Sequence, residues 1–289
     1  MQRYAFLCTV LVLFLGAAPL ALAGDGYILS KDHIYGHKAG MALTFDVVKP
    51  EAASNGIGLI NVVSGGWRSE YFDLDEAMVE SRTSGGRFTT LLDKGYTIFV
   101  VRHGSSPYFK VPDAVADMRR AVRFIRHNAK DFGIDPGKIG VYGASAGGHL
   151  SLMLGLASDE GDASAKDELD RESKRVAAVV AYYPPVDLRT IVGKNERYPA
   201  LDFDPAQAEA ISPITFVTKD DAPTLLIHGD KDTTVPISNS EKMFTALKEA
   251  GIAADFITMP GAGHGYKGEQ AQQAAAALAA WFDKHLAGK

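Results

Sequence analysis

The stretch VYGASAGGHL, residues 141–150, places Ser145 at the centre of the pentapeptide GASAG, residues 143–147. A strand-like run, residues 138–142, precedes it, and a helical pattern, residues 146–156, follows it. A strand, a G-x-S-x-G turn and a helix together form a nucleophile elbow, a tight turn that projects the serine from the end of the strand. Glycine and alanine leave room for strand and helix to approach closely. The stretch therefore predicts Ser145 as a nucleophile at a helix N-terminus, where the helix dipole stabilises nearby negative charge.

Strand-like and helical runs alternate along the rest of the chain. Strands are expected at residues 41–48, 57–63, 97–101, 138–142, 176–182, 224–228 and 254–259. Helices are expected at residues 113–130, 146–156 and 268–286, with one more between the last two strands. This alternation predicts an α/β fold with a doubly wound, mainly parallel sheet.

Two long segments, residues 66–86 and 184–217, depart from that alternation and look irregular. Loops of this length in a compact domain are usually functional. The two segments are therefore expected to form a small lid over the site. Their aromatic residues include Trp67, Tyr71, Phe72, Tyr198 and Phe203.

A serine hydroxyl needs a general base and an acidic residue that orients the base. In the fold that carries the nucleophile elbow, the chain order is serine, acid, histidine. His264 lies in a glycine-rich loop after the last predicted strand and is the predicted base. Asp230 and Asp232 both follow the strand at residues 224–228. Asp232 precedes a turn into the next helix and is the predicted acid, whereas Asp230 is expected to bond loop amides.

A developing oxyanion needs backbone N–H donors. Ala146, directly after the nucleophile, is expected to supply one. The sequence VSGGW, residues 63–67, follows an early strand and is expected to supply the other. Gly66 is the candidate, with Gly65 or Trp67 beside it. Trp67 is also expected to stand next to the acyl carbonyl and bind substrate; the alternative is that its ring anchors the loop.

Composition narrows the class of protein. The chain has 289 residues and a net charge of −5, with no basic stripe, so nucleic acid is not an expected partner. The single cysteine is Cys8, which rules out a thiol nucleophile after removal of the N-terminal segment. His33 and His37 lie in strand-like surroundings rather than on a helix, and no acidic cluster suggests a cation site. Neither a metal nor a cofactor is expected.

The N-terminal segment predicts export. Arg3 precedes an apolar run at residues 7–18, and the sequence ALA ends at Ala23. This pattern indicates a signal peptide, residues 1–23, and a catalytic domain at residues 24–289. The run is shorter than the roughly 20 residues that a membrane span needs, which disfavours the alternative of an anchor. A secreted or periplasmic protein without stable membrane insertion is expected.

Four stretches together resemble the α/β-hydrolase superfamily over nearly the whole mature chain. Within it, the sequence is similar to secreted bacterial bifunctional feruloyl/acetyl-xylan esterases and to the acetyl-esterase lipase group. The stretches are GASAGGHL at 143–150, ISPI at 211–214, LIHGDKD at 226–232 and GAGHG at 261–265. The resemblance implies a triad of Ser145, Asp232 and His264 and favours Asp232 over Asp230. One departure is the sequence VSGG at 63–66, where relatives usually carry HGGG.

The resemblance implies a cofactor-free serine carboxylesterase that acts on short-chain acyl esters. A small molecule or a polysaccharide would supply the ester, with acetyl or feruloyl groups on plant polysaccharide as candidates. Two alternatives remain. A serine exopeptidase of the prolyl-oligopeptidase type shares the order of triad residues, and a non-catalytic hydrolase-fold protein would only bind.

Overall fold

The computed structural model describes residues 26–84 and 86–288. The expected signal peptide, residues 1–23, lies outside the described residues. Among those described, no helix combines the length and the apolar character that crossing a bilayer requires.

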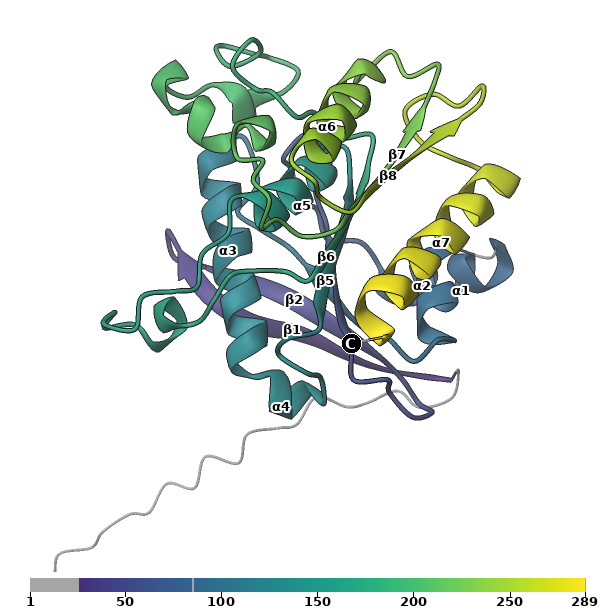
Figure 1. Cartoon of the computed structure of the whole chain (residues 1–289). Helices are drawn as coiled ribbons and strands as arrows, with labels where there is room; N and C mark the ends of the chain where they lie inside the picture. Colours follow the sequence, from purple (N-terminus) through teal and green to yellow (C-terminus); the bar gives the residue numbers. More distant parts are fainter. Residues whose placement is uncertain (1–25, 85, 289) are drawn as a thin grey trace, which may run out of the picture.

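A single sheet of eight strands runs through the molecule in the order β1-β2-β4-β3-β5-β6-β7-β8 (Figure 1). The strands are β1 Tyr27–Lys38, β2 Met41–Pro50, β3 Gly58–Val62, β4 Thr97–Val101, β5 Ile139–Ala144, β6 Ala178–Tyr182, β7 Thr224–Gly229 and β8 Ala254–Met259. Strand β2 is antiparallel to β1 and β4, and the strands from β4 to β8 are parallel to their neighbours. The predicted doubly wound, mainly parallel sheet is confirmed. Its parallel strands end at one common edge.

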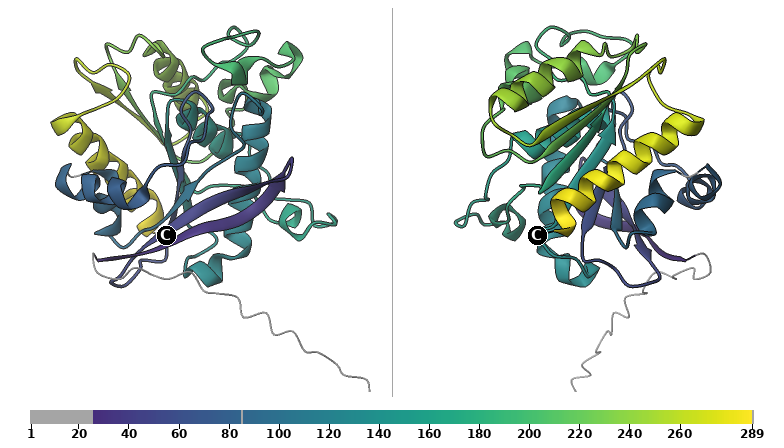
Figure 2. Two further views of the ribbon diagram at one scale, coloured as in Figure 1. Left: turned by 180° about the vertical axis from the view of Figure 1, so that it is seen from behind. Right: turned by 45° about the vertical axis from the view of Figure 1, so that its right-hand side comes forward.

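Helices cover both faces of the sheet (Figures 1 and 2). They are α1 Leu74–Ser84, α2 Arg87–Leu92, α3 Val111–His127, α4 Ala129–Phe132, α5 Ala146–Leu156, α6 Ser238–Glu249 and α7 Gly268–Phe282. Helices α3, α4, α5 and α6 pack on one face, and α1, α2 and α7 pack on the other. Each face therefore has its own apolar core.

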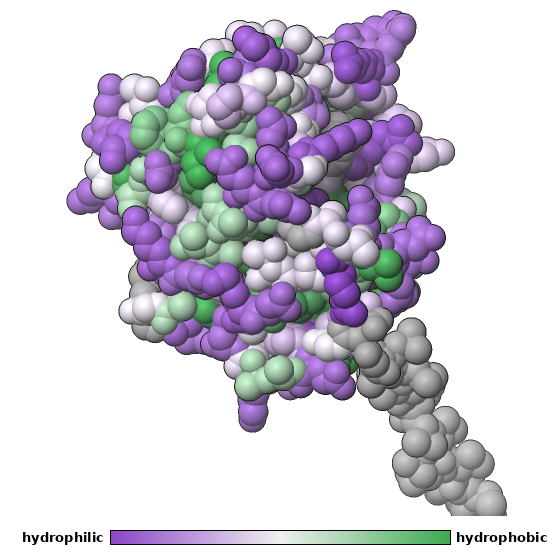
Figure 3. Space-filling model, turned by 90° about the vertical axis from the view of Figure 1, so that its right-hand side faces the viewer, coloured by the Kyte–Doolittle hydropathy of each residue, from purple (hydrophilic) through white to green (hydrophobic). Residues whose placement is uncertain are grey.

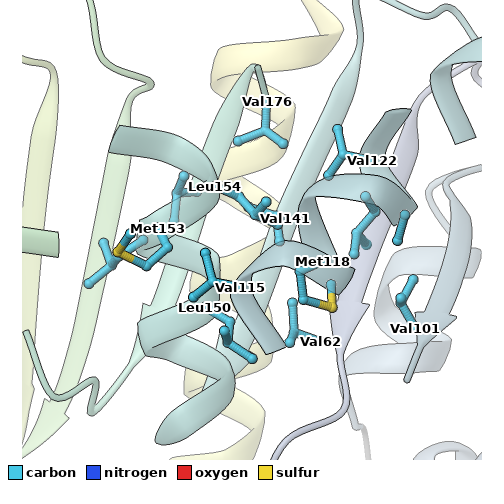
Figure 4. Close-up of a cluster of buried hydrophobic side chains, with 14 of the residues drawn as sticks. Val62, Val101, Val115, Met118, Val122, Val141, Leu150, Met153, Leu154 and Val176 are labelled. Carbon is cyan, nitrogen blue, oxygen red and sulfur yellow. The ribbon is translucent and has the colours of Figure 1, made fainter. Parts of the chain in front are cut away.

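The core between the sheet and helices α3 and α5 holds the elbow in place. Val115 and Met118 of α3 and Leu150 and Met153 of α5 face strand residues such as Val141 (Figure 4). Full burial of each such side chain contributes about 1.5–3 kcal/mol. Because parallel strands are covered on both faces, their sequences are continuous apolar runs, as in TIFVV of β4. This rigid layer fixes the sheet edge from which the candidate residues project.

The two segments expected to be irregular differ in structure. Residues 66–86 contain helix α1, whose buried residues Leu74, Met78 and Ser81 lie on one face, so the expectation of an irregular segment was wrong there. Residues 184–217 contain only four short 3-10 turns, Pro199–Leu201, Pro205–Gln207, Glu209–Ile211 and Pro213–Thr215. Tyr198 from this second segment lies over Gly66, since a Cβ added to Gly66 would meet its ring at 2.9 Å. The lid is therefore formed mainly by residues 184–217.

Candidate active site

The turn between β5 and α5 has the geometry of a nucleophile elbow. Ser145 has φ 55° and ψ −119°, and α5 begins at the next residue. A Cβ on Gly143 would lie 2.5 Å from the carbonyl of Gly147, and one on Gly147 would lie 2.8 Å from the carbonyl oxygen of Val62. Only glycine fits such close approaches. The unusual backbone of Ser145 costs on the order of 1–3 kcal/mol, which the packed strand and helix must offset.

Three side chains predicted from the sequence meet at this edge. The His264 Nε2 atom lies 2.9 Å from the Ser145 Oγ atom, and these residues are 119 positions apart in the chain. On the other side of the imidazole, Nδ1 lies 2.7 Å from the Asp232 Oδ2 atom. The carboxylate of Asp232 is fully buried, whereas His264 is 24% exposed. The structure thus brings Ser145, His264 and Asp232 into one hydrogen-bonded chain.

The surroundings of Asp232 keep its carboxylate charged and fixed. Its Oδ1 atom accepts hydrogen bonds from the backbone N–H groups of Thr234 at 2.8 Å and Val235 at 2.9 Å. Burial raises the pKa of Asp232, but the hydrogen bonds from Val235, His264 and Thr234 outweigh it and hold the pKa below its usual range. An ionised Asp232 accepts the proton of His264 Nδ1 and leaves Nε2 free to accept the serine proton.

The competing aspartate, Asp230, performs the role predicted for it. Its Oδ1 atom accepts a hydrogen bond from the N–H of Gly261 at 2.7 Å. Gly261 belongs to the loop that carries His264, so Asp230 braces that loop from below. The structure leaves Asp230 out of the hydrogen-bonded chain that contains Ser145.

The backbone amides next to Ser145 divide into paired and unpaired groups. The N–H of Gly65 donates to the carbonyl of Arg68 at 2.9 Å, so the expectation that Gly65 contributes to the oxyanion hole was wrong. Within residues 26–84 and 86–288, by contrast, the N–H groups of Gly66 and Ala146 have no hydrogen-bond acceptor. The N–H of Gly147 donates to the Ser64 carbonyl at 3.2 Å and ties the two segments together. Two free donors therefore flank the serine.

Comparison with known proteins agrees with this geometry. The profile of the BD-FAE family matches residues 45–247. The chain belongs to the BD-FAE family. It is also similar to Esterase LipQ of Mycobacterium tuberculosis, with 28% identity over 224 residues that make up 72% of this chain and 50% of LipQ. The chain therefore spans about half the length of this curated relative.

Two solved structures share the fold of this BD-FAE member. One is described as a truncated form of a carbohydrate esterase from gut microbiota, with a TM-score of 0.75 and 26% identity. The match covers 93% of this chain and 100% of that one. The other is an acetyl ester-xyloside bifunctional hydrolase from Caldicellulosiruptor lactoaceticus, with a TM-score of 0.67, 25% identity and coverage of 93% and 95%. The fold is that of the α/β-hydrolases.

A serine–histidine pair supports the loop in which this BD-FAE chain departs from HGGG. The Ser64 Oγ atom lies 2.8 Å from His103 Nε2, and His103 Nδ1 lies 2.8 Å from the Gly104 carbonyl oxygen. Because a carbonyl only accepts, Nδ1 carries the proton and Ser64 donates to Nε2. Burial lowers the pKa of His103 and keeps the ring neutral. His103, whose role the sequence left open between pocket lining and structure, is structural.

Trp67 does not occupy the position expected for a substrate-binding residue. Its side chain is buried, with 4% of the residue exposed, and packs in the core on the α5 face. The indole Nε1–H donates to His149 Nδ1 at 3.2 Å, and His149 Nε2 donates to the carbonyl of Ile211 at 2.8 Å. With φ 57°, the backbone of Trp67 turns the side chain inward. Trp67 therefore anchors the donor loop to α5 and to the lid.

The His149 imidazole should stay neutral far below the pH at which an exposed histidine titrates. Burial lowers its pKa to about 4, and protonation at Nδ1 would break the bond from Trp67. The unfolded chain, with a histidine pKa of about 6.5, binds the proton at higher pH than the folded chain. Stability is therefore complete above that value, falls as pH drops towards 4, and levels off below.

The ring ¹⁵N chemical shifts of His149, followed by NMR between pH 7 and 4.5, test this expectation. They should remain those of a neutral ring, while those of the exposed His37 should titrate. Titration of His149 near the ordinary histidine pKa would contradict the assigned Trp67–His149–Ile211 link.

Tyr183 is a site residue that the sequence did not reveal. It follows β6 with φ 37°, and its ring centroid lies 4.6 Å from that of His264 and 5.4 Å from that of Tyr266. Its position after a parallel strand is the signal that could have found it, because side chains at this edge line sites in α/β folds. The residue type alone carried no such information.

Proposed function

We propose that the protein is a serine carboxylesterase that hydrolyses short-chain acyl esters, with acetyl or feruloyl groups on plant polysaccharide as candidate substrates. The observation that carries the proposal is the continuous hydrogen-bonded chain Ser145–His264–Asp232 beside two unpaired amides. A nucleophile, its base, the orienting acid and oxyanion donors are the parts that acyl transfer requires.

In the proposed first half-reaction, the Ser145 Oγ atom attacks the ester carbonyl while His264 Nε2 takes its proton. Asp232 stabilises the imidazolium through Nδ1. The N–H groups of Ala146 and Gly66 bind the negative oxygen of the tetrahedral intermediate. The bond to the alcohol breaks as His264 returns the proton to the leaving oxygen, and the acyl group stays on Ser145.

In the second half-reaction, His264 takes a proton from water, which attacks the acyl-serine carbonyl. The same two amides hold the oxyanion. Collapse releases the carboxylic acid and restores the Ser145 hydroxyl with the proton from His264. The sequence and the site need no further group for this cycle.

The names of the relatives support an ester as the substrate and a carbohydrate as its alcohol. LipQ is named an esterase, and the two solved structures are named a carbohydrate esterase and an acetyl ester-xyloside hydrolase. Secretion or periplasmic location is part of the proposal and depends on the signal-peptide pattern at residues 1–23.

A substrate panel tests the proposal against both alternatives. Purified protein should release product from p-nitrophenyl acetate and acetylated xylan or a feruloyl ester, and should leave aminoacyl anilides intact. Anilide turnover at comparable kcat/KM would favour the exopeptidase instead. Absence of turnover on every substrate would favour a hydrolase fold that only binds.

A further inference from the structure

A second pocket lies beside the candidate active site and has no role in the chemistry described so far. It has a volume of about 400 Å³ and is bounded by α1, α2 and α7 and by residues that follow β6 and β8. Its volume falls within the range of about 300–1,000 Å³ typical of small-ligand sites. Figure 3 views the side of the molecule that carries these three helices, where hydrophobic residues form small groups among hydrophilic ones.

The pocket is joined to the candidate site through Tyr183. This residue lines the pocket, and its ring is also the aromatic neighbour of His264, at 4.6 Å between centroids. Tyr266, only two residues after His264, lines the same pocket and packs edge-on against Tyr183 at 5.4 Å. The pocket therefore adjoins the His264 side of Ser145.

The geometry of acyl transfer determines which half of an ester lies on that side. His264 must reach the leaving oxygen to protonate it, so the alcohol extends past the imidazole. The carbonyl oxygen instead lies towards Gly66 and Ala146, on the loop that Tyr198 covers. A group that continues from the leaving oxygen past His264 meets Tyr183 and the pocket behind it.

The pocket wall combines aromatic rings with polar groups of opposite charge. Phe72, Phe88, Tyr182, Tyr183 and Tyr266 supply the rings. Glu80 and Arg87 also line the pocket, and the charge of Arg87 is close enough to oppose the burial-driven rise in the pKa values of Tyr182 and Tyr183. Rings offer flat apolar contact area. A carboxylate and a guanidinium together bind hydroxyl groups without favouring a charged ligand.

We infer that this pocket is the subsite for the leaving alcohol of the ester, and that this alcohol carries an uncharged, hydroxylated ring such as a sugar. The inference rests on the proposed esterase function and deepens it. The aromatic wall covers the apolar face of the ring, while Glu80 and Arg87 bond its hydroxyl groups. The hydroxyl of Tyr266 is buried without a partner among the described residues, so a ligand hydroxyl that reached it would also satisfy that group.

A pocket-filling substitution tests the position of this subsite. Ala271 on α7 lines the pocket, whereas Ala276 on the same helix is exposed and does not. Ala271→Phe should lower kcat/KM by about tenfold or more for cyclohexyl acetate and for a monoacetylated methyl xyloside, because pocket contacts of this size matter at that level. Ethyl acetate and its longer-acyl homologues should change by less than about twofold, and Ala276→Phe should match the wild type on every ester.

A second variant tests the class of the ligand. Arg87→Ala should lower kcat/KM for the acetylated xyloside more than for cyclohexyl acetate, because only the sugar offers hydroxyl groups to the guanidinium. Equal losses on the two esters would overturn the assignment of a hydroxylated ring.

The outcomes separate this inference from the proposed function. Wild-type turnover combined with an Ala271→Phe loss that is absent, uniform across all esters, or dependent on acyl length overturns the alcohol subsite alone. No turnover by the wild type on any ester overturns the proposed function, and the subsite with it.

Discussion

Ser145→Ala is expected to lower kcat on p-nitrophenyl acetate by about 10⁵-fold or more, the scale seen when a triad nucleophile is removed. The variant loses the only hydroxyl within hydrogen-bond distance of His264 Nε2, at 2.9 Å. Alanine keeps the Cβ and therefore the same backbone strain at φ 55°. The melting temperature should consequently stay close to that of the wild type.

Ser151→Ala provides a control on the same helix. The Ser151 hydroxyl donates to the carbonyl of Gly147 at 2.8 Å and does not contact His264. Its removal should leave kcat within a few-fold of the wild type. A folded Ser145→Ala protein with nearly wild-type kcat would refute the assignment of the nucleophile.

Asp232→Asn is expected to lower kcat by about 10⁴-fold, as loss of the acid does in a serine triad. The neutral amide cannot stabilise the imidazolium, and it no longer selects the tautomer with the proton on Nδ1. Asn retains the size of Asp and a carbonyl oxygen that can accept from Thr234 and Val235. The fold should therefore survive the change.

Asp230→Asn is the matched comparison, two residues away in the same loop. It weakens the bond to the Gly261 amide at 2.7 Å, so the main loss should be in thermal stability. The two variants should be compared by kcat at equal folded fraction, with circular dichroism to measure that fraction. A larger loss of kcat in Asp230→Asn would mean that the acid is misassigned.

Much of the fold was predictable because its central strands are buried on both faces. Such strands must be apolar throughout, as in residues 97–101, and the helices between them show a clear apolar face. The elbow was also predictable, because the close contacts at Gly143 and Gly147 permit only glycine. The order of the triad residues follows from the fold, and a turn after Asp232 distinguished it from Asp230.

Other features depend on tertiary contacts that leave weak traces in the sequence. Strand β1 is an edge strand with two register shifts, so its sequence lacks regular alternation and it was not predicted. Helix α1 buries only Leu74, Met78 and Ser81, and its other residues are mostly polar. The inward turn of Trp67 depends on a positive φ that a tryptophan rarely adopts. The pairing of Ser64 with His103 joins residues 39 positions apart.

The central claim is that Ser145 carries the acyl group, and stoichiometric labelling tests it most directly. A p-nitrophenyl phosphonate ester transfers its phosphonyl group to an activated serine and releases one p-nitrophenol per site. The wild type should release one equivalent of p-nitrophenol and lose activity in parallel. Peptide mass spectrometry should then place the phosphonyl group on Ser145, and Ser145→Ala should release none. Active wild-type protein that carries the label on another residue, or that remains unlabelled and fully active, would contradict the account.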